Sequence, residues 1–301
     1  MPFRVTNSSQ TSILSDRIAL SSQRLAAAQE RVSSGKRINR PSDDPFGAEA
    51  VLKFRTSQAS VEQFQQNAAT VRDGLQSADG ALESYQQLLD RAQVLLTQGA
   101  SDSTSATARV SIAQEIDGLR TQMMTIANTK TNDRFVFGGT RQNVAPFDSA
   151  GNPSLAATTT QMVQLEPDAA PVAAGVMADA VFSNSGGTVF ATLASAAAAL
   201  RGTGNPAADK AAVLASMDGL VTFSNQSETG RAQLGASFNG VDGASSRLAS
   251  QALSFQESAN RFESADFAAA ALELTQASNA LQATLQATAF TSKGSLMNLI
   301  G

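Results

Sequence analysis

Two neighbouring carboxylates are the residues of this chain that most suggest catalytic chemistry. Asp43 and Asp44 are the only adjacent acidic pair, and two close carboxylates can act as a general acid and a general base. They lie between Ser42 and Pro45, where side-chain oxygens can accept hydrogen bonds from free helix N–H groups and proline fits the first helical turn. No second acidic cluster is close in sequence. We therefore interpret Ser42, Asp43, Asp44 and Pro45 as a helix cap and turn.

The composition removes most other catalytic chemistry. The 301 residues contain no His and no Cys, so imidazole bases, thiolate nucleophiles, disulfides and the usual zinc or iron sites are excluded. The pairs Gly138-Gly139 and Gly186-Gly187 lack the residues that surround a phosphate-binding loop and are interpreted as turns. We predict no catalytic residue, no cofactor and no metal site. The rival of a different class is an enzyme that uses carboxylates, lysines or hydroxyls alone, and the composition without His and Cys argues against it.

The charges and the apolar runs bear on partners and location. There are 22 Lys and Arg against 26 Asp and Glu, and the scattered basic residues do not form the clustered surface that nucleic acid requires. No segment approaches the roughly 18 apolar residues of a membrane span. The first residues also lack the apolar region of a secretory signal peptide. We expect no nucleic-acid partner, no membrane insertion, and no cleavable signal peptide.

Prolines divide the chain into two long arms and a middle segment. None occurs between Phe46 and Ala145 or after Ala207, while four of the eight fall within 141–205. Because proline breaks helix interiors, the arms can hold long helices and the middle cannot. Short alternations at Arg134–Phe137 and Thr158–Leu165 predict strands, and the Ala-rich stretch Val189–Leu200 predicts a helix.

Apolar residues recur at spacings of three and four along both arms, which is typical of helices that pack along their lengths. The first arm predicts a helix from about Pro45 to Gln98 and a second one, through Ile112–Ile126, that folds back as a hairpin. The later arm predicts a long helix through Leu234–Phe262, separated from a preceding helix near Glu228–Gly230. The predicted fold class is mainly α: an elongated rod of long helices, with paired terminal helices and a small inserted β-containing domain.

The two chain ends hold helices whose apolar surface is not confined to one face. Residues 267–301 contain only two charges, Glu273 and Lys293, and a weakly polar helix is usually surrounded by protein. Two interpretations stay open: the ends pair with each other inside a monomer, or they pack against copies of the chain. The candidate assembly residues are Leu14, Ile18, Leu25, Val32, Lys36, Arg37, Phe267, Leu274, Leu281, Leu285, Leu296 and Leu299. Among these, Lys36 and Arg37 form either a solvated loop or an intersubunit salt-bridge contact.

A resemblance to a known family covers both ends. Residues 25–50, LAAAQERVSSGKRINRPSDDPFGAEA, closely resemble the N-terminal signature of the bacterial flagellin superfamily, and residues 262–283 are similar to its C-terminal helix. The resemblance implies an inner domain of paired terminal helices, a helical bundle, and an inserted domain that faces solvent. It also implies export, unfolded, through the flagellum-specific secretion apparatus.

Within that superfamily, three features resemble the branch found at the junction between hook and filament. They are PSDDP at 41–45, NTKTNDRFVFGGTRQNVAPF at 128–147, and SLMNLI at 295–300. This resemblance implies an extracellular, non-catalytic adaptor in the flagellum. The implied partners are the first hook-associated protein on the hook side, flagellin on the filament side, copies of the chain, and an export chaperone at the C-terminal helix. The alternative is flagellin, the filament-forming subunit.

The elements and the resemblance together predict three domains. Residues 1–42 with 267–301 form a terminal coiled-coil domain, and 43–140 with 206–266 form a rod-like helical bundle. Residues 141–205 form the small inserted domain, with short strands and one helix.

Overall fold

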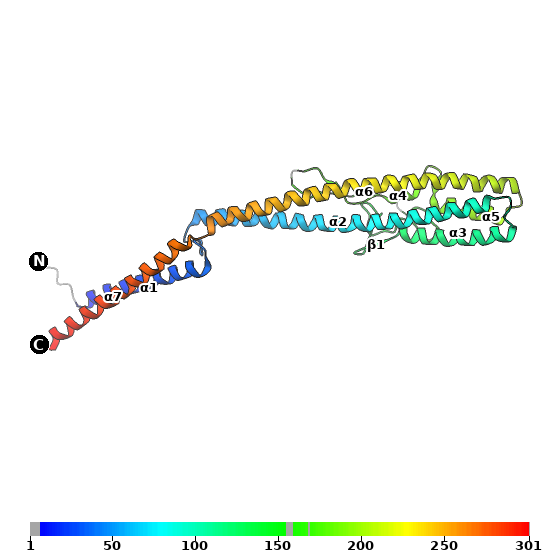
Figure 1. The fold of residues 1–301 in the computed structure, drawn as a ribbon. Helices are drawn as coiled ribbons and strands as arrows, with labels where there is room; N and C mark the ends of the chain where they lie inside the picture. The colour runs from blue at the N-terminus through cyan, green and yellow to red at the C-terminus, as the bar shows by residue number, and fades with distance from the viewer. Residues whose placement is uncertain (1–6, 155–158, 168, 301) are drawn as a thin grey trace. The chain divides into compact units, whose positions relative to one another are not determined.

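Long helices dominate the computed structural model, which describes residues 7–154, 159–167 and 169–300, with side chains from 12 to 290 within those ranges (Figure 1). The prediction of a mainly α chain of long helices with small strand pieces is confirmed. The elements are α1 Asn7–Ser34, α2 Pro45–Ala100, α3 Ala106–Ala127, β1 Lys130–Thr131, β2 Arg134–Phe135, β3 Met162–Val163, β4 Val172–Ala173, α4 Ala178–Phe182, β5 Ser183–Asn184, β6 Gly187–Thr188, α5 Val189–Arg201, α6 Pro206–Glu263 and α7 Phe267–Ile300.

Contacts group these elements into two compact units. Unit 1 contains residues 1–61 and 250–301, and unit 2 contains residues 62–249. The long helices α2 and α6 contribute residues to both. The division into three domains that the sequence suggests stays a prediction.

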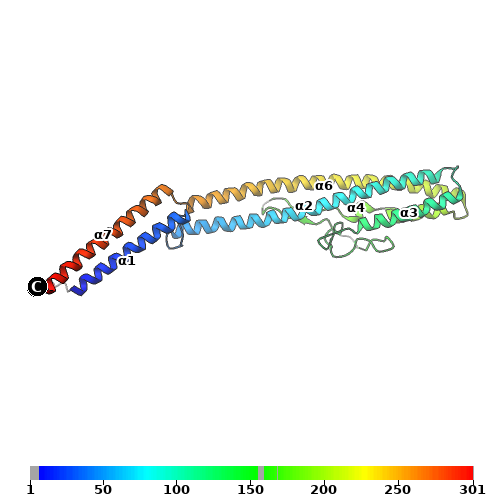
Figure 2. The same cartoon turned by 60° about the horizontal axis from the view of Figure 1, so that its bottom comes forward.

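The core of unit 2 follows the predicted seam of α2. Leu75, Leu82, Leu89 and Leu96, seven residues apart, are fully buried, because residues at this spacing share one face of a helix that packs along its length. Helix α3 folds back beside α2, and Arg91 of α2 donates to Glu115 of α3 at 2.6 and 2.8 Å. In Figure 2, α6 runs along α2 and α3 lies beside the same pair. These helices enclose one apolar core.

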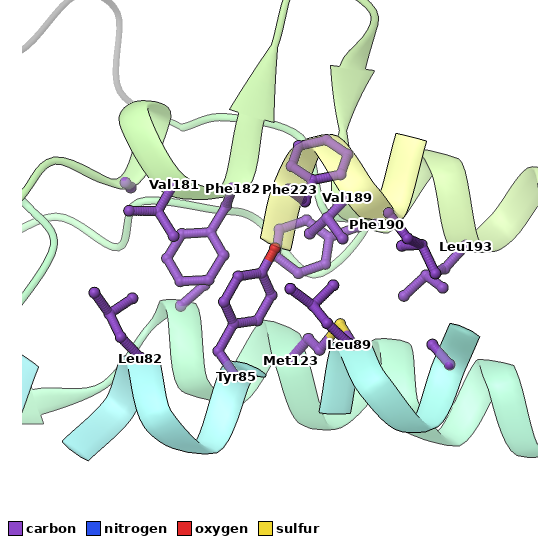
Figure 3. Close-up of a cluster of buried hydrophobic side chains, with 14 of the residues drawn as sticks. Leu82, Tyr85, Leu89, Met123, Val181, Phe182, Val189, Phe190, Leu193 and Phe223 are labelled. Atoms are coloured by element: carbon purple, nitrogen blue, oxygen red, sulfur yellow. The ribbon is translucent and has the colours of Figure 1, made fainter. Parts of the chain in front are cut away.

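A cluster of aromatic rings joins the inserted segment to this core (Figure 3). The ring of Phe182 from α4 lies 4.7 Å from that of Tyr85 on α2, 5.3 Å from Phe137 and 6.0 Å from Phe147. Phe190 of α5 packs edge-on against Phe147 at 4.9 Å. All five rings are at most 1% exposed. Residues of the inserted segment therefore complete the bundle core.

The strands are short antiparallel pairs: β1 with β2, β3 with β4, and β5 with β6. Parts of both predicted strand regions are strands, as β2 and β3, and the predicted helix is α5. Between β1 and β2, Asn132 and Asp133 adopt φ values of +50° and +61°. Two successive left-handed residues are the requirement of a tight hairpin turn, and Asn and Asp tolerate that conformation best after Gly.

The predicted interruption near Glu228–Gly230 is wrong, because α6 is continuous from Pro206 to Glu263. Gly230 lies inside this helix at a close contact rather than at a break. A Cβ there would lie 3.2 Å from Cγ2 of Val181 and 3.5 Å from Cδ1 of Leu82. The glycine thus allows α4 to approach α6 closely, at the usual cost of glycine within a helix.

Candidate assembly surface and its joint

Helices α1 and α7 of unit 1 pack against each other in antiparallel directions, and we call them the terminal pair (Figure 1). Arg31 near the end of α1 donates to both carboxylate oxygens of Glu273 near the start of α7, at 2.8 and 2.7 Å. Further along, the hydroxyls of Ser21 and Thr284 lie 3.5 Å apart. Ala28 at the contact is 1% exposed. Small side chains at these positions allow the two backbones to approach closely.

The ten apolar residues among the predicted assembly residues divide into three groups in the structure. Six are half-buried on the sides where α1 and α7 meet: Leu14, Ile18, Leu25, Val32, Leu274 and Leu281. Phe267 and Leu285 are 68% and 47% exposed. The predictions at Leu296 and Leu299 lie outside the residues whose side chains the structure describes. The first group supports pairing of the ends within one chain, and the second leaves apolar surface for a partner.

Other large apolar side chains of unit 1 are also exposed. Phe46 and Phe290 are 86% and 79% exposed, and Leu272 is 60% exposed. Ile13 and Leu20 on α1 are about half exposed. Exposed apolar groups in this number are typical of surfaces that associate with protein. Sequence periodicity did not identify Ile13, Leu20 or Phe46, because these positions lie outside the repeat of apolar residues at spacings of three and four.

A short backbone pairing connects the segment after α1 with the segment between α6 and α7. We call this region, residues 35–44 with 263–266, the joint. The N–H of Arg37 donates to the carbonyl of Glu263 at 2.7 Å, and the N–H of Ala265 donates to the carbonyl of Gly35 at 3.0 Å. Gly35 has φ +68°, a left-handed conformation that glycine adopts without strain after a helix. The joint thereby fixes the exit of α1 against the end of α6.

The carboxylate of Glu263 is the electrostatic centre of the joint. It accepts from Arg55 Nη2 at 2.7 Å at both oxygens and lies 2.6 Å from Lys36 Nζ. Its side chain is 12% exposed. Burial raises the pKa of Glu263, but the hydrogen bonds from Lys36 and Arg55 outweigh burial and hold the pKa below its ordinary value. Two cations from different segments therefore share one anion.

Arg37, the second predicted cation, also has partners within the chain. Its Nη1 lies 3.0 Å from Asp44 Oδ2, and its Nη2 donates to the carbonyl of Phe262 at 3.0 Å. Lys36 and Arg37 thus both stabilise the joint. An additional role for them between subunits stays a prediction.

The adjacent carboxylates lie at the start of α2. Asp44 Oδ1 accepts from the N–H of Gly47 at 2.9 Å, the geometry of a helix cap. Asp43 Oδ2 accepts from the N–H groups of Arg40 and Asn39 at 2.9 and 3.1 Å. Backbone hydrogen bonds are the largest cause that lowers the pKa of both carboxyls, with the guanidinium of Arg37 adding to the effect at Asp44. Both are therefore ionised and engaged in structure, unlike a dyad that shares a proton.

Unit 2 also contains a cleft with charged groups at its rim. This cleft, of about 820 Å³, lies among the ends of α2, α3, α5 and α6. At its rim, Lys210 forms an ion pair with Asp102 at 2.8 Å, and Arg201 forms one with Asp117. Within those same residues, no three acidic side chains gather as a metal site would require, and none of the helices has the length and apolar content to cross a membrane.

Comparison with known families decides what these helices belong to. Residues 5–142 match the bacterial flagellin N-terminal helical region, and residues 217–300 match the bacterial flagellin C-terminal helical region. The chain belongs to the flagellin family. The two matched regions include both members of the terminal pair and the whole joint, so the geometry described above lies in the family's shared part.

Individual flagellin-family relatives match most of the chain. Flagellar hook-associated protein 3 of Escherichia coli is 27% identical over 277 residues, which cover 86% of this chain and 87% of that protein. A flagellin of Listeria monocytogenes is 27% identical over 84% of this chain and 83% of its own. The solved structure of a putative flagellar hook-associated protein from Vibrio parahaemolyticus has a TM-score of 0.67 with 19% identity, and the match covers 74% of this chain and all of that one. The fold is therefore that of the family.

Proposed function

We propose that this flagellin-family chain is a structural subunit of the bacterial flagellum that connects the hook to the filament. The observation that carries the proposal is the similarity to flagellar hook-associated protein 3, which extends over 86% of the chain and therefore through the middle segment as well as the ends. The activity is binding, not catalysis. Its partners would be the first hook-associated protein on the hook side, flagellin on the filament side, and further copies of the chain.

The terminal pair supports this function because its apolar side chains are only partly buried within one chain. Its seam is half-buried, while Phe267, Leu272 and Phe290 stay largely exposed. Helices in proteins gain most of their stability from the packing of their apolar faces, so covering these side chains with neighbouring subunits provides both attachment and stability. The proposed assembly surface includes the remaining predicted residues of α7, Leu285, Leu296 and Leu299.

The joint supports a mechanical role. Glu263 binds Lys36, which follows α1, and Arg55, which lies on α2. Force on the terminal pair would pass through these bonds and the backbone pairing at Gly35 and Arg37 to the adjoining helices of unit 1. We further expect export through the flagellar secretion apparatus with a chaperone bound at α7.

A second candidate function is the filament subunit itself, favoured by the similarity to Listeria flagellin over most of the chain. A filament subunit polymerises without limit, whereas an adaptor stops after a short layer. Light scattering of concentrated protein during long incubation separates them: steady growth of scattering indicates a filament subunit.

Deletion of the gene in the motile parent bacterium tests the main proposal. Cells should keep hooks and release flagellin into the medium, and the full chain should restore attached filaments. A chain that lacks residues 285–301 should fail to restore them, although it stays helical and the near-ultraviolet signal of Tyr85 stays that of the full chain. Attached filaments in the deletion strain would refute the adaptor role.

A further inference from the structure

A groove in unit 2 lies between helix α2 and the segment 131–174, and we call it the amide groove. Its volume is about 530 Å³, which is within the usual range of sites for small ligands. Polar side chains make up much of its lining. Four of them are carboxamides: Asn67, Asn132, Gln142 and Gln161. A lining of this kind suits a ligand that has many hydrogen-bonding groups of its own.

Gly74 of α2 leaves space in the amide groove that helix packing does not require. Among the described residues, a Cβ at Gly74 would have no atom from another part of the chain within 4 Å, and Gly74 lines the groove. Gly230 differs, because a Cβ there would lie 3.2 Å from Cγ2 of Val181. The missing side chain of Gly74 therefore adds volume to the groove, although glycine destabilises the middle of a helix.

The carboxamides of the groove have hydrogen-bonding groups left for a ligand. Gln142 Nε2 donates to Gln161 Oε1, which leaves the oxygen of Gln142 as an acceptor next to the amide donors of Gln161. Asn67 accepts from Gln63 Nε2 at 3.2 Å through its oxygen, which leaves its own amide donors. A hydroxyl both donates and accepts, so neighbouring donors and acceptors match a ligand with several hydroxyls.

Arg134 gives the amide groove its charge. Among the described residues that line the groove, Arg134 alone is charged. It is exposed, and no carboxylate of the described chain lies within ion-pair distance of it. The hairpin that carries Arg134 is held against α2, because Thr131, its partner across the strands, has its hydroxyl 2.7 Å from that of Ser77. A guanidinium in this state can bind a carboxylate through two parallel hydrogen bonds.

We propose that the amide groove binds a saccharide that carries carboxylates, of the uronate class. The hydroxyls of the sugar hydrogen-bond to the carboxamides, and one carboxylate binds Arg134. The apolar C–H groups of a sugar ring contact Val71, Val136 and Val163, which also line the groove. This binding function goes beyond the proposed role in the flagellum and does not depend on it.

An acidic peptide fits the same groove less well. A peptide that binds in an extended conformation pairs its backbone with an open strand edge. The strands beside the groove, β1 to β4, are only two residues long, so they offer few backbone groups. A peptide of acidic residues also has no hydroxyls for the carboxamides. The lining therefore favours the saccharide.

Isothermal titration calorimetry of the purified full chain with trigalacturonate tests the site. We expect saturable binding, about tenfold tighter than that of maltotriose, which has the hydroxyls of a trisaccharide but no carboxylate. A peptide of three glutamates has the same net charge as trigalacturonate and should bind at least about tenfold more weakly. No saturable binding of trigalacturonate, or binding of the peptide as tight as that of the saccharide, would overturn the proposal.

Filling the space beside Gly74 tests where the saccharide binds. Gly74→Leu should weaken the binding of trigalacturonate by at least about tenfold, because the new side chain occupies the groove. Gly80→Leu is the matched control, since Gly80 lies on the same helix, has no atom within 4 Å of its Cβ position and does not line the groove. Leucine favours helix over glycine, so thermal unfolding should show that both variants are folded. Equal binding by the two variants would place the saccharide elsewhere and refute the site.

Removing the charge tests the contact with the carboxylate. Arg134→Gln should weaken the binding of trigalacturonate about tenfold, to the level of maltotriose, and leave the binding of maltotriose unchanged. Arg141→Gln, at an exposed arginine outside the lining, should bind both saccharides as the native chain does. Unchanged binding of trigalacturonate by Arg134→Gln would contradict the proposed contact. These assays use the isolated chain, so their outcome is separate from the position of the protein on the flagellum.

Discussion

Unit 2 and unit 1 use their apolar residues in opposite ways. In unit 2, Tyr85, Phe137, Phe182 and Phe190 are completely buried and pack ring against ring. In unit 1, Phe46, Phe267 and Phe290 are at least two-thirds exposed, and the seam between α1 and α7 is made of small and aliphatic side chains. One unit completes its core within the chain, and the other keeps apolar surface for contacts beyond it.

The difference teaches where stability and assembly reside. Buried aromatic side chains contribute most to the free energy of folding because they remove the most apolar area from water. The terminal pair removes less apolar area from water, so its stability depends more on contacts with neighbouring subunits. A change in unit 2 should therefore destabilise the monomer, and a change in unit 1 should mainly affect association.

Phe182→Ala should give the largest effect on monomer stability. It removes a ring in contact with four other rings, and we expect the free energy of unfolding to fall by about 3 to 5 kcal/mol. Tyr85 is the single tyrosine in a chain without tryptophan, so its near-ultraviolet circular dichroism during urea unfolding reports this cluster. The control is Phe290→Ala, the same substitution at a 79% exposed site. It should change the free energy of unfolding by less than about 0.5 kcal/mol. Equal effects of the two substitutions would remove the distinction between the units.

Ala28→Leu should disturb the terminal pair and spare unit 2. Ala28 is 1% exposed at the contact between α1 and α7, and added methylenes in a tight contact cost about 1 to 3 kcal/mol. Amide hydrogen exchange should become faster in α1 and α7, while the Tyr85 signal is unchanged. Ala26→Leu, on an exposed position of α1, is the control. Faster exchange in unit 2 as well would mean that the units unfold together.

Glu263→Gln should loosen the joint. It removes the anion shared by Lys36 and Arg55, whose own side chains are 45% and 53% exposed and can be hydrated, so we expect a loss of about 1 to 2 kcal/mol. Hydrogen exchange of the amides of Arg37 and Ala265 is the measurement. Glu257→Gln, at an exposed acid on the same helix, should leave these amides protected. Unchanged protection in Glu263→Gln would show that the backbone pairing alone holds the joint.

The pH dependence of the joint has a definite sign. The pKa of Glu263 is lower in the folded chain than its ordinary value, so the unfolded chain binds a proton first as the pH falls. The stabilisation is complete above the ordinary glutamate pKa and is lost as the pH falls through the folded pKa. The protection of the amides of Arg37 and Ala265, measured relative to intrinsic exchange at each pH, should fall over that acidic range in the native chain, and Glu263→Gln should abolish the change.

Tyr85→Phe should have the smallest effect. The hydroxyl is buried and has no hydrogen-bond partner among the described residues, and burial raises the pKa of Tyr85, which keeps it protonated. Removing an unpaired buried hydroxyl leaves the packing intact, so stability should be unchanged or higher by about 1 kcal/mol. Far-ultraviolet circular dichroism during urea unfolding is the measurement. A marked loss of stability would show that this hydroxyl has a polar partner.

Helical periodicity allowed the long helices to be predicted because it depends on residues close in sequence. The seam of α2 from Val61 to Leu96 is an example, whereas α5 was predicted from its Ala-rich composition. The same reasoning failed at Gly230, where glycine was taken as a helix break. Its reason is spatial, a close contact with Val181 of α4, and nothing in the local sequence reports it.

The joint could be predicted only in part for the same reason. Ser42 to Pro45 could be interpreted as a cap from local chemistry alone. The partner of Lys36 and Arg55 is Glu263, more than 200 residues away, and no spacing rule connects them. The hairpin of β1 and β2 could have been found, since Asn132-Asp133 is a turn signal between the short strands.

The position of the protein on the flagellum tests the central claim most directly. Gold-labelled antibody against the inserted segment, viewed by electron microscopy on intact flagella of the native bacterium, gives that position. The adaptor role predicts label confined to the boundary between hook and filament. Label along the whole filament would contradict it and make the chain a filament subunit.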